Sequence, residues 1–162
     1  TVKIHTEPMR IYSKKIDKLD KLPDKATVGI PNDPTNSGRA LAVLQSAGLI
    51  KLKEGAGVTA TTRDIIENPK ELDIKMADAA TLPRVLDDAA ICCINTNYAL
   101  DAKLDPMSAL FVEPGDSPFA NVLVVRPEGK DNPSIAKLGK ALQSDEIAEY
   151  LKDNYPSCVL AF

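Results

Sequence analysis

Apolar positions along the chain alternate between short runs typical of strands and a spacing typical of helices. Apolar runs at 26–31, 90–94 and 121–125 predict strands, and the strand at 90–94 is expected to be buried. In residues 39–47 the apolar positions instead recur with helical spacing, and Gly48 follows where a C-terminal cap belongs. The sequence therefore predicts a helix over 39–47.

Similar patterns predict the remaining elements. Strands are expected at 9–13, 72–76 and 110–113, and helices at 61–67, 80–86, 97–102, 134–143 and 145–150. The helix at 61–67 is expected to begin with Thr61 as its cap and to stop before Pro69. This alternation of strands and helices predicts an α/β fold with a mixed sheet.

Composition narrows the possible functions. The chain has 162 residues, of which 44% are hydrophobic and 27% charged, so it suffices for one buried core or two small lobes. Its net charge is -3 and its basic residues are interspersed with acidic ones, which argues against nucleic-acid binding. No apolar run reaches the roughly 18 residues that a membrane span requires.

The cysteines do not indicate a metal or redox site by their spacing. Cys92 and Cys93 lie in an apolar run, where cysteine behaves as a small hydrophobic residue, and Cys158 stands alone. With His5 as the one histidine, few soft metal ligands are available. The sequence predicts no metal site, and a disulfide from Cys158 stays open.

A polar turn at 30–39 leads from a predicted strand into a predicted helix. The first N–H groups of a helix favour an anion, and Arg39 in the first turn adds a planar fork suited to a carboxylate. An alternative is that Thr35, Asn36 and Ser37 only cap the helix while Arg39 lies on its surface.

Two further polar segments accompany strands. Asn95 and Asn97 follow an apolar strand directly, and ligands in α/β proteins bind beyond the carboxyl ends of strands. Asn121 ends the loop 116–121, and ordinary turn chemistry explains both segments equally well. No nucleophile stands in a catalytic motif, so composition and spacing favour a binding protein over an enzyme.

Several motifs resemble the NlpA/MetQ family of methionine-binding lipoproteins, in the family's order and over almost the whole chain. They are the segments 5–9, 12–16, 30–36, 38–41, 47–53, 67–70, 82–84, 94–99, 111–113, 116–118 and 143–146. The resemblance implies a two-lobed periplasmic-binding-protein-like fold of type II with mixed sheets. Residues 10–111 would form lobe two, and residues 1–9 with 112–162 would form the crossing strands and the remnant of an incomplete lobe one.

The resemblance also implies a set of ligand-binding residues. Arg39 would hold the carboxylate of the ligand, and Asn36, Asn95 and Asn121 would serve its polar ends. Tyr98 and His5 are further candidates for the pocket. No catalytic residue, metal or cofactor is implied.

By this resemblance the protein is the solute-binding component of an ABC importer, with a membrane permease as partner and methionine as ligand. Family members are lipid-anchored at the cell surface or in the periplasm, through a segment that this chain is expected to lack. A methionine-containing dipeptide or another neutral amino acid is the alternative ligand. A surface interaction lipoprotein and an enzyme on the same scaffold are more remote alternatives. An incomplete lobe one would expose apolar surface, which predicts self-association.

Overall fold

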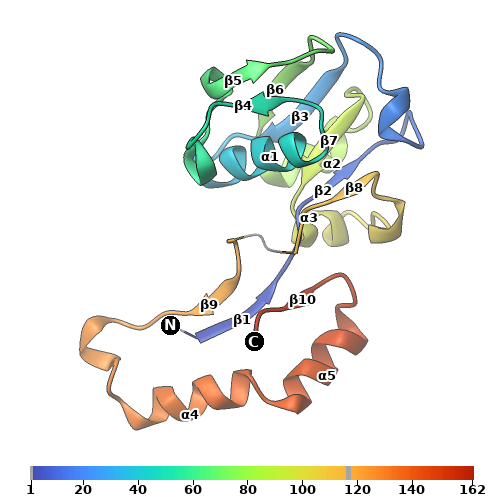
Figure 1. The fold of residues 1–162 in the computed structure, drawn as a ribbon. Helices are drawn as coiled ribbons and strands as arrows, with labels where there is room; N and C mark the ends of the chain where they lie inside the picture. The colour runs from blue at the N-terminus through green and yellow to red at the C-terminus, as the bar shows by residue number, and fades with distance from the viewer. Residues whose placement is uncertain (1, 116–117) are drawn as a thin grey trace. The chain divides into compact units, whose positions relative to one another are not determined.

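A computed structural model describes residues 2–115 and 118–162, which divide into two compact units (Figure 1). The central unit is Met9–Pro114, and the terminal unit combines Thr1–Pro8 with Gly115–Phe162. The lobe boundaries expected from the sequence fall after residues 9 and 111, whereas the units separate after Pro8 and Pro114. The two units are described separately below.

The central unit is built on a mixed sheet. Its strand order is β6 (Asp73–Ala77), β3 (Thr27–Pro31), β7 (Ile91–Ile94), β2 (Arg10–Tyr12) and β8 (Phe111–Val112). Strand β3 runs parallel to β6 and β7, while β2 is antiparallel to β7 and β8. The predicted α/β class with a mixed sheet is therefore confirmed.

Helices pack on both faces of this sheet. Helix α1 (Pro34–Ser46) lies against one face, and α2 (Leu82–Val85) and α3 (Thr96–Asp101) contribute to the other (Figure 1). The cluster beneath α1 includes Met9, Ile11, Val28, Ile30, Ile91 and Cys93 with Leu41 and Leu44 of the helix. The opposite cluster includes Tyr12, Cys92 and Ile94 with Leu82, Leu86 and Ala99. The alternation of side chains along β7 thus sends the adjacent cysteines into different halves of the core.

The two central cysteines are buried hydrophobic residues, as predicted. Cys92 and Cys93 are both 0% exposed. Burial raises the pKa of the Cys92 thiol to about 12, and it raises the pKa of Cys93 as well. Neither thiol forms a reactive thiolate at neutral pH.

Local signals define both ends of α1. Asp33 is its N-cap and accepts a hydrogen bond from the backbone N–H of Asn36 at 2.9 Å, with Pro34 in the first turn. Gly48 follows the helix with φ +74, the left-handed conformation that glycine adopts at low cost. At Gly38 the backbones approach closely, because a Cβ there would lie 2.3 Å from the carbonyl oxygen of Val58.

The helix predicted at 61–67 is wrong. Only a 3₁₀ turn forms, at Thr62–Asp64, and Ile65–Glu67 is strand β5, which pairs antiparallel with β4 (Lys51–Leu52). Thr61 still caps the turn in a reciprocal arrangement with Asp64. The β-branched isoleucines fit an extended backbone once a partner strand is available. Short 3₁₀ segments also occur at Leu19–Lys21, Gly57–Thr59, Ala79–Thr81, Pro106–Ser108 and Pro127–Gly129.

The terminal unit contains a small antiparallel sheet and two helices. Strand β1 (Val2–Thr6) lies between β10 (Val159–Leu160) and β9 (Asn121–Leu123) (Figure 1). Helices α4 (Pro133–Leu142) and α5 (Asp145–Asn154) occur where helices were predicted, and α5 continues past residue 150. Within the described residues, every helix is too short or too polar to cross a bilayer.

Candidate functional site

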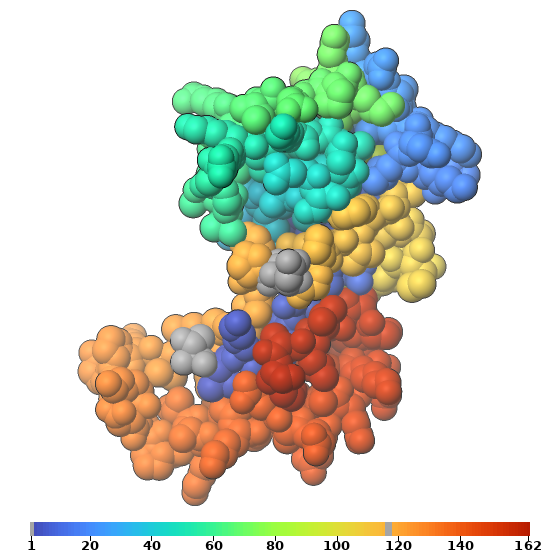
Figure 2. Space-filling view, in the orientation of Figure 1, coloured from blue at the N-terminus to red at the C-terminus, as the bar shows by residue number. Residues whose placement is uncertain are grey.

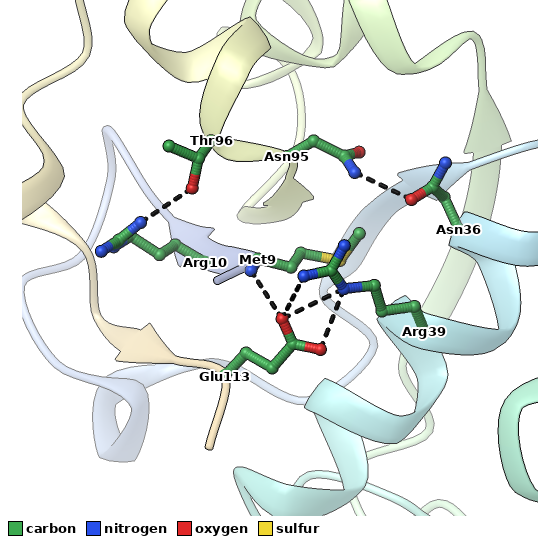
Figure 3. A network of polar contacts seen from close by, with 7 residues as sticks. All are labelled: Met9, Arg10, Asn36, Arg39, Asn95, Thr96 and Glu113. Carbon is green, nitrogen blue, oxygen red and sulfur yellow. Dashed lines mark hydrogen bonds and ion pairs between the residues drawn. The ribbon is translucent and has the colours of Figure 1, made fainter. Parts of the chain in front are cut away.

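Asn36 and Asn95 meet at the carboxyl ends of two neighbouring parallel strands. Asn95 follows β7 directly and occupies the N-cap position of α3, and Asn36 lies in the first turn of α1, after β3. Nδ2 of Asn95 donates to Oδ1 of Asn36 at 2.8 Å (Figure 3). The sheet topology therefore brings together two polar segments that are 59 residues apart in the sequence.

Asp33 fixes the orientation of the Asn36 amide. Nδ2 of Asn36 donates to both carboxylate oxygens of Asp33, at 3.1 and 3.0 Å, so its Oδ1 faces Asn95. Oδ1 of Asn95 is buried and finds no hydrogen-bond partner within residues 2–115 and 118–162. A buried acceptor without a donor is costly, so this oxygen suits a donor supplied by a ligand.

Arg39 lies on the same helix as Asn36, three residues further on and therefore on the same face. The residue is 8% exposed, so the alternative that places it on the helix surface is wrong. Its Nε donates to Oε1 and Oε2 of Glu113 at 2.9 and 3.0 Å, and its Nη2 reaches Oε2 at 2.5 Å (Figure 3). The carboxylate of Glu113 also accepts the backbone N–H of Met9 at 2.8 Å, which anchors the pair to the start of β2.

A second buried arginine lies next to this network. Arg10, on β2, is 6% exposed, and its Nη1 donates to Oγ1 of the buried Thr96 at 2.8 Å (Figure 3). Arg10 pairs across the sheet with Ile94, the residue before Asn95. The arginine thereby ties β2 to the start of α3.

Tyr98 occupies a more structural position. It lies on α3, is partly buried, and packs against the hydrophobic cluster that contains Tyr12 and Leu82. A ring in this place supports α3 and, through it, the position of Asn95.

His5 and Asn121 belong to the terminal unit, where they are cross-strand neighbours on β1 and β9. Nε2 of His5 lies 3.3 Å from Nδ2 of Asn121 and 3.2 Å from Oε1 of Glu7. The six candidates thus fall into two groups. Arg39, Asn36, Asn95 and Tyr98 are held by the central unit, and His5 and Asn121 by the terminal unit.

Three residues that organise the site were not singled out from the sequence. Glu113 is the last residue of the predicted strand at 110–113, and a charge at the end of an apolar strand is a signal for a buried charged partner. Asp33 precedes a proline at a helix start, which is a recognisable capping pattern. Arg10 had no such signal, because charged residues are also common on the solvent side of edge strands.

The family model for NlpA lipoproteins matches residues 1–161. The chain belongs to the NlpA lipoprotein family. This confirms the predicted family, since the match extends over both units.

The names of individual relatives of this NlpA family member describe binding proteins. The sequence likewise favours a binding protein over an enzyme. The D-methionine-binding lipoprotein MetQ of Salmonella typhimurium is 50% identical over 145 residues, which cover 88% of this chain and 54% of that protein. The chain therefore spans about half the length of the curated relatives that it matches.

Solved structures support the same fold. A nutrient binding protein from Burkholderia cenocepacia bound to methionine has a TM-score of 0.92 and 48% identity, covering 99% of this chain and 69% of that one. An ABC transporter, periplasmic substrate-binding protein from Coxiella burnetii has a TM-score of 0.91 and 42% identity, covering 98% and 68%. The predicted substrate-binding-protein fold is confirmed, and the chain represents part of it.

Proposed function

We propose that this chain is part of the solute-binding component of an ABC importer and that it binds methionine. The names of its relatives support the ligand and the role, and the ABC transporter relative supports a membrane permease as partner. The lipoprotein relatives further support an anchored position of the whole protein at the cell surface or in the periplasm.

Arg39 is proposed to bind the ligand carboxylate. A guanidinium has five N–H donors in a rigid fork, so pairing with the Glu113 carboxylate fixes its plane and is compatible with a second carboxylate. A ligand without a carboxylate would forgo this interaction.

The asparagines are proposed to bind the amino group and the remaining polar atoms. Oδ1 of Asn95 is a buried acceptor, and an ammonium group is a strong donor to such an oxygen. Asn36 holds the Asn95 amide in place. Tyr98 would support the site through α3.

The observation that carries this proposal is the presence, in the same part of the central unit, of a buried guanidinium and an amide oxygen that has no donor among the described residues (Figure 3). These two groups are complementary to the acid and the amine of a free amino acid. Either group alone would fit many ligands, whereas the combination selects zwitterions.

The test is a titration calorimetry cycle with ligand analogues. Arg39→Ala should weaken methionine binding by more than tenfold, but it should barely change the binding of methionine methyl ester, which lacks the carboxylate charge. Asn95→Ala should weaken methionine binding while leaving 4-methylthiobutanoate, which lacks the amine, unaffected. Arg63→Ala, at an exposed position, is the matched control. Equal losses for methionine and its ester in Arg39→Ala would remove Arg39 from the carboxylate site.

A competition series separates methionine from the alternative ligands. L-methionine, D-methionine, a glycyl-methionine dipeptide and leucine should displace a bound methionine probe with different affinities. Methionine should bind more tightly than the dipeptide and leucine. Tighter binding of the dipeptide or of leucine would change the assigned ligand while keeping the binding role.

A further inference from the structure

Three potential metal ligands meet on strand β1 and next to strand β10. His5, Glu7 and Cys158 each offer one ligand atom, and these atoms lie within 4.8 Å of one another. The strand register explains the meeting, because β1 and β10 pair antiparallel with His5 opposite Leu160 and Thr6 opposite Val159. Continuing this register by one residue places Cys158 opposite Glu7. His5 lies on β1 and Glu7 directly follows it, and a spacing of two residues puts both side chains on one face of an extended chain.

We propose that His5, Glu7 and Cys158 form a zinc site. Zinc binds imidazole nitrogen, carboxylate oxygen and cysteine thiolate, and it accepts three protein ligands with a water molecule in the fourth position. A mixed set of one soft thiolate, one imidazole and one carboxylate disfavours Ca²⁺ and Mg²⁺, which prefer oxygen ligands.

The arrangement of the imidazole fits this assignment. Nε2 of His5 lies 3.2 Å from Oε1 of Glu7. Two ligand atoms of one tetrahedral zinc ion, each about 2.0–2.2 Å from the metal, would lie about 3.3–3.6 Å apart.

Cys158 is the cysteine suited to coordination. Cys92 and Cys93 are fully buried, and burial raises the pKa of both thiols. Cys158 is only partly buried and lines a concavity of about 310 Å³ together with Ala148, Glu149, Lys152, Pro156 and Leu160. An ion in solution therefore reaches Cys158, and the single accessible thiol makes the site easy to assign.

The site would fasten the C-terminal strand to β1. Small folds with little hydrophobic core commonly depend on a metal or a disulfide, and the described residues of the terminal unit include none of the buried hydrophobic core residues. Cysteine and histidine spacing predicts no metal site because two ligands precede residue 8 and the third is at position 158. Only the pairing of β1 with β10 brings them together.

Zinc affinity is measured first, by competition with a chromophoric chelator on the 162-residue chain at neutral pH under reducing conditions. We expect one zinc ion per chain. Cys158→Ser and Glu7→Gln should each weaken binding at least about tenfold, since even indirect partners of a metal site contribute that much. Glu128→Gln removes a carboxylate elsewhere in the terminal unit and should leave the affinity unchanged.

Cobalt substitution identifies the ligands directly. Co²⁺ added to the chain should produce a thiolate-to-metal charge-transfer band in the near ultraviolet, and this band should vanish in Cys158→Ser. Zinc should also raise the melting temperature of the unmodified chain but not that of Cys158→Ser. Circular dichroism checks that each variant is folded.

Several outcomes would overturn the zinc site. They are the absence of zinc binding, an affinity unchanged by Cys158→Ser, and a cobalt complex without the charge-transfer band. Cys158 and Glu7 are not among the proposed methionine ligands. Failure of zinc binding would therefore leave the methionine proposal intact, and failure of methionine binding would leave the zinc site intact.

Discussion

The central and terminal units differ in how far they bury their apolar side chains. The buried hydrophobic core residues of the described chain all lie between Met9 and Ala99, in the central unit. The terminal unit exposes apolar side chains along its helices and last strands, whose surfaces are visible in orange and red in Figure 2. They include Val122, Val124, Leu138, Tyr150, Tyr155, Val159, Leu160 and Phe162.

This difference shows that helices can form where the sequence predicts them without being part of a buried core. Helices α4 and α5 have proper caps, Asn132 and Ser144, and they form where the sequence predicts them. Local signals therefore suffice to place these two helices. A buried core needs packed layers of secondary structure, and the central unit has them, with helices on both faces of its sheet.

The largest predicted effect concerns the buried ion pair of the central unit. Glu113→Gln leaves the buried Arg39 without a compensating charge and should lower the free energy of unfolding by about 3–5 kcal/mol. Glu67→Gln is the control, because its ion pair with Lys51 is exposed and should contribute less than about 1 kcal/mol. Urea denaturation measures both, and equal losses would contradict the assignment of Arg39 and Glu113 to the core.

A matched pair of leucines tests the contrast in packing. Leu41, on α1, is 0% exposed, so Leu41→Ala should cost about 2–5 kcal/mol of unfolding free energy. Leu138, on α4, is 45% exposed, so Leu138→Ala should cost less than about 0.5 kcal/mol. Thermal and urea unfolding provide the measurement. A large loss for Leu138→Ala would mean that the terminal unit is packed more tightly than its exposure indicates.

A smaller effect is expected at the two helix caps. Asp33→Ala removes the cap of α1 and the support of the Asn36 amide, and should cost about 1–2 kcal/mol. Asn132→Ala removes the cap of α4 and should cost about 1 kcal/mol or less, because α4 contributes little to the core. Hydrogen exchange should show fraying confined to α4 in Asn132→Ala. Global destabilisation by that variant would argue against independent units.

The smallest effect is expected for surface substitutions that change the self-association of the chain, which is measured as its average mass in solution. The terminal unit exposes several large apolar side chains, and exposed apolar surface favours association, so light scattering of the chain should give an average mass above that of a monomer. Val124→Lys, on the terminal unit at 76% exposure, should lower that mass. Met107→Lys, on the central unit at 89% exposure, should leave it unchanged. A monomeric mass for the unmodified chain would contradict the expectation.

The elements of the chain were largely predictable, and the errors have a physical cause. The periodicity of α1 and Gly48 predicted the helix and its end, but the helix begins at Pro34, before the predicted residue 39, so Arg39 lies beyond its first turn. Residues 65–67 form a strand because Lys51–Leu52 is available as a partner, and no local pattern contains that information. Propensity yields to tertiary pairing where a segment is short.

For the candidate site, the sequence by itself determined which residue types are present at the ends of strands: Asn36, Arg39 and Asn95. The tertiary structure alone decided that Asn36 and Asn95 share a hydrogen bond, that Glu113 pairs with Arg39, and that Cys158 reaches His5 and Glu7. Local signals act over one helical turn or one strand, whereas these contacts depend on which strands lie side by side.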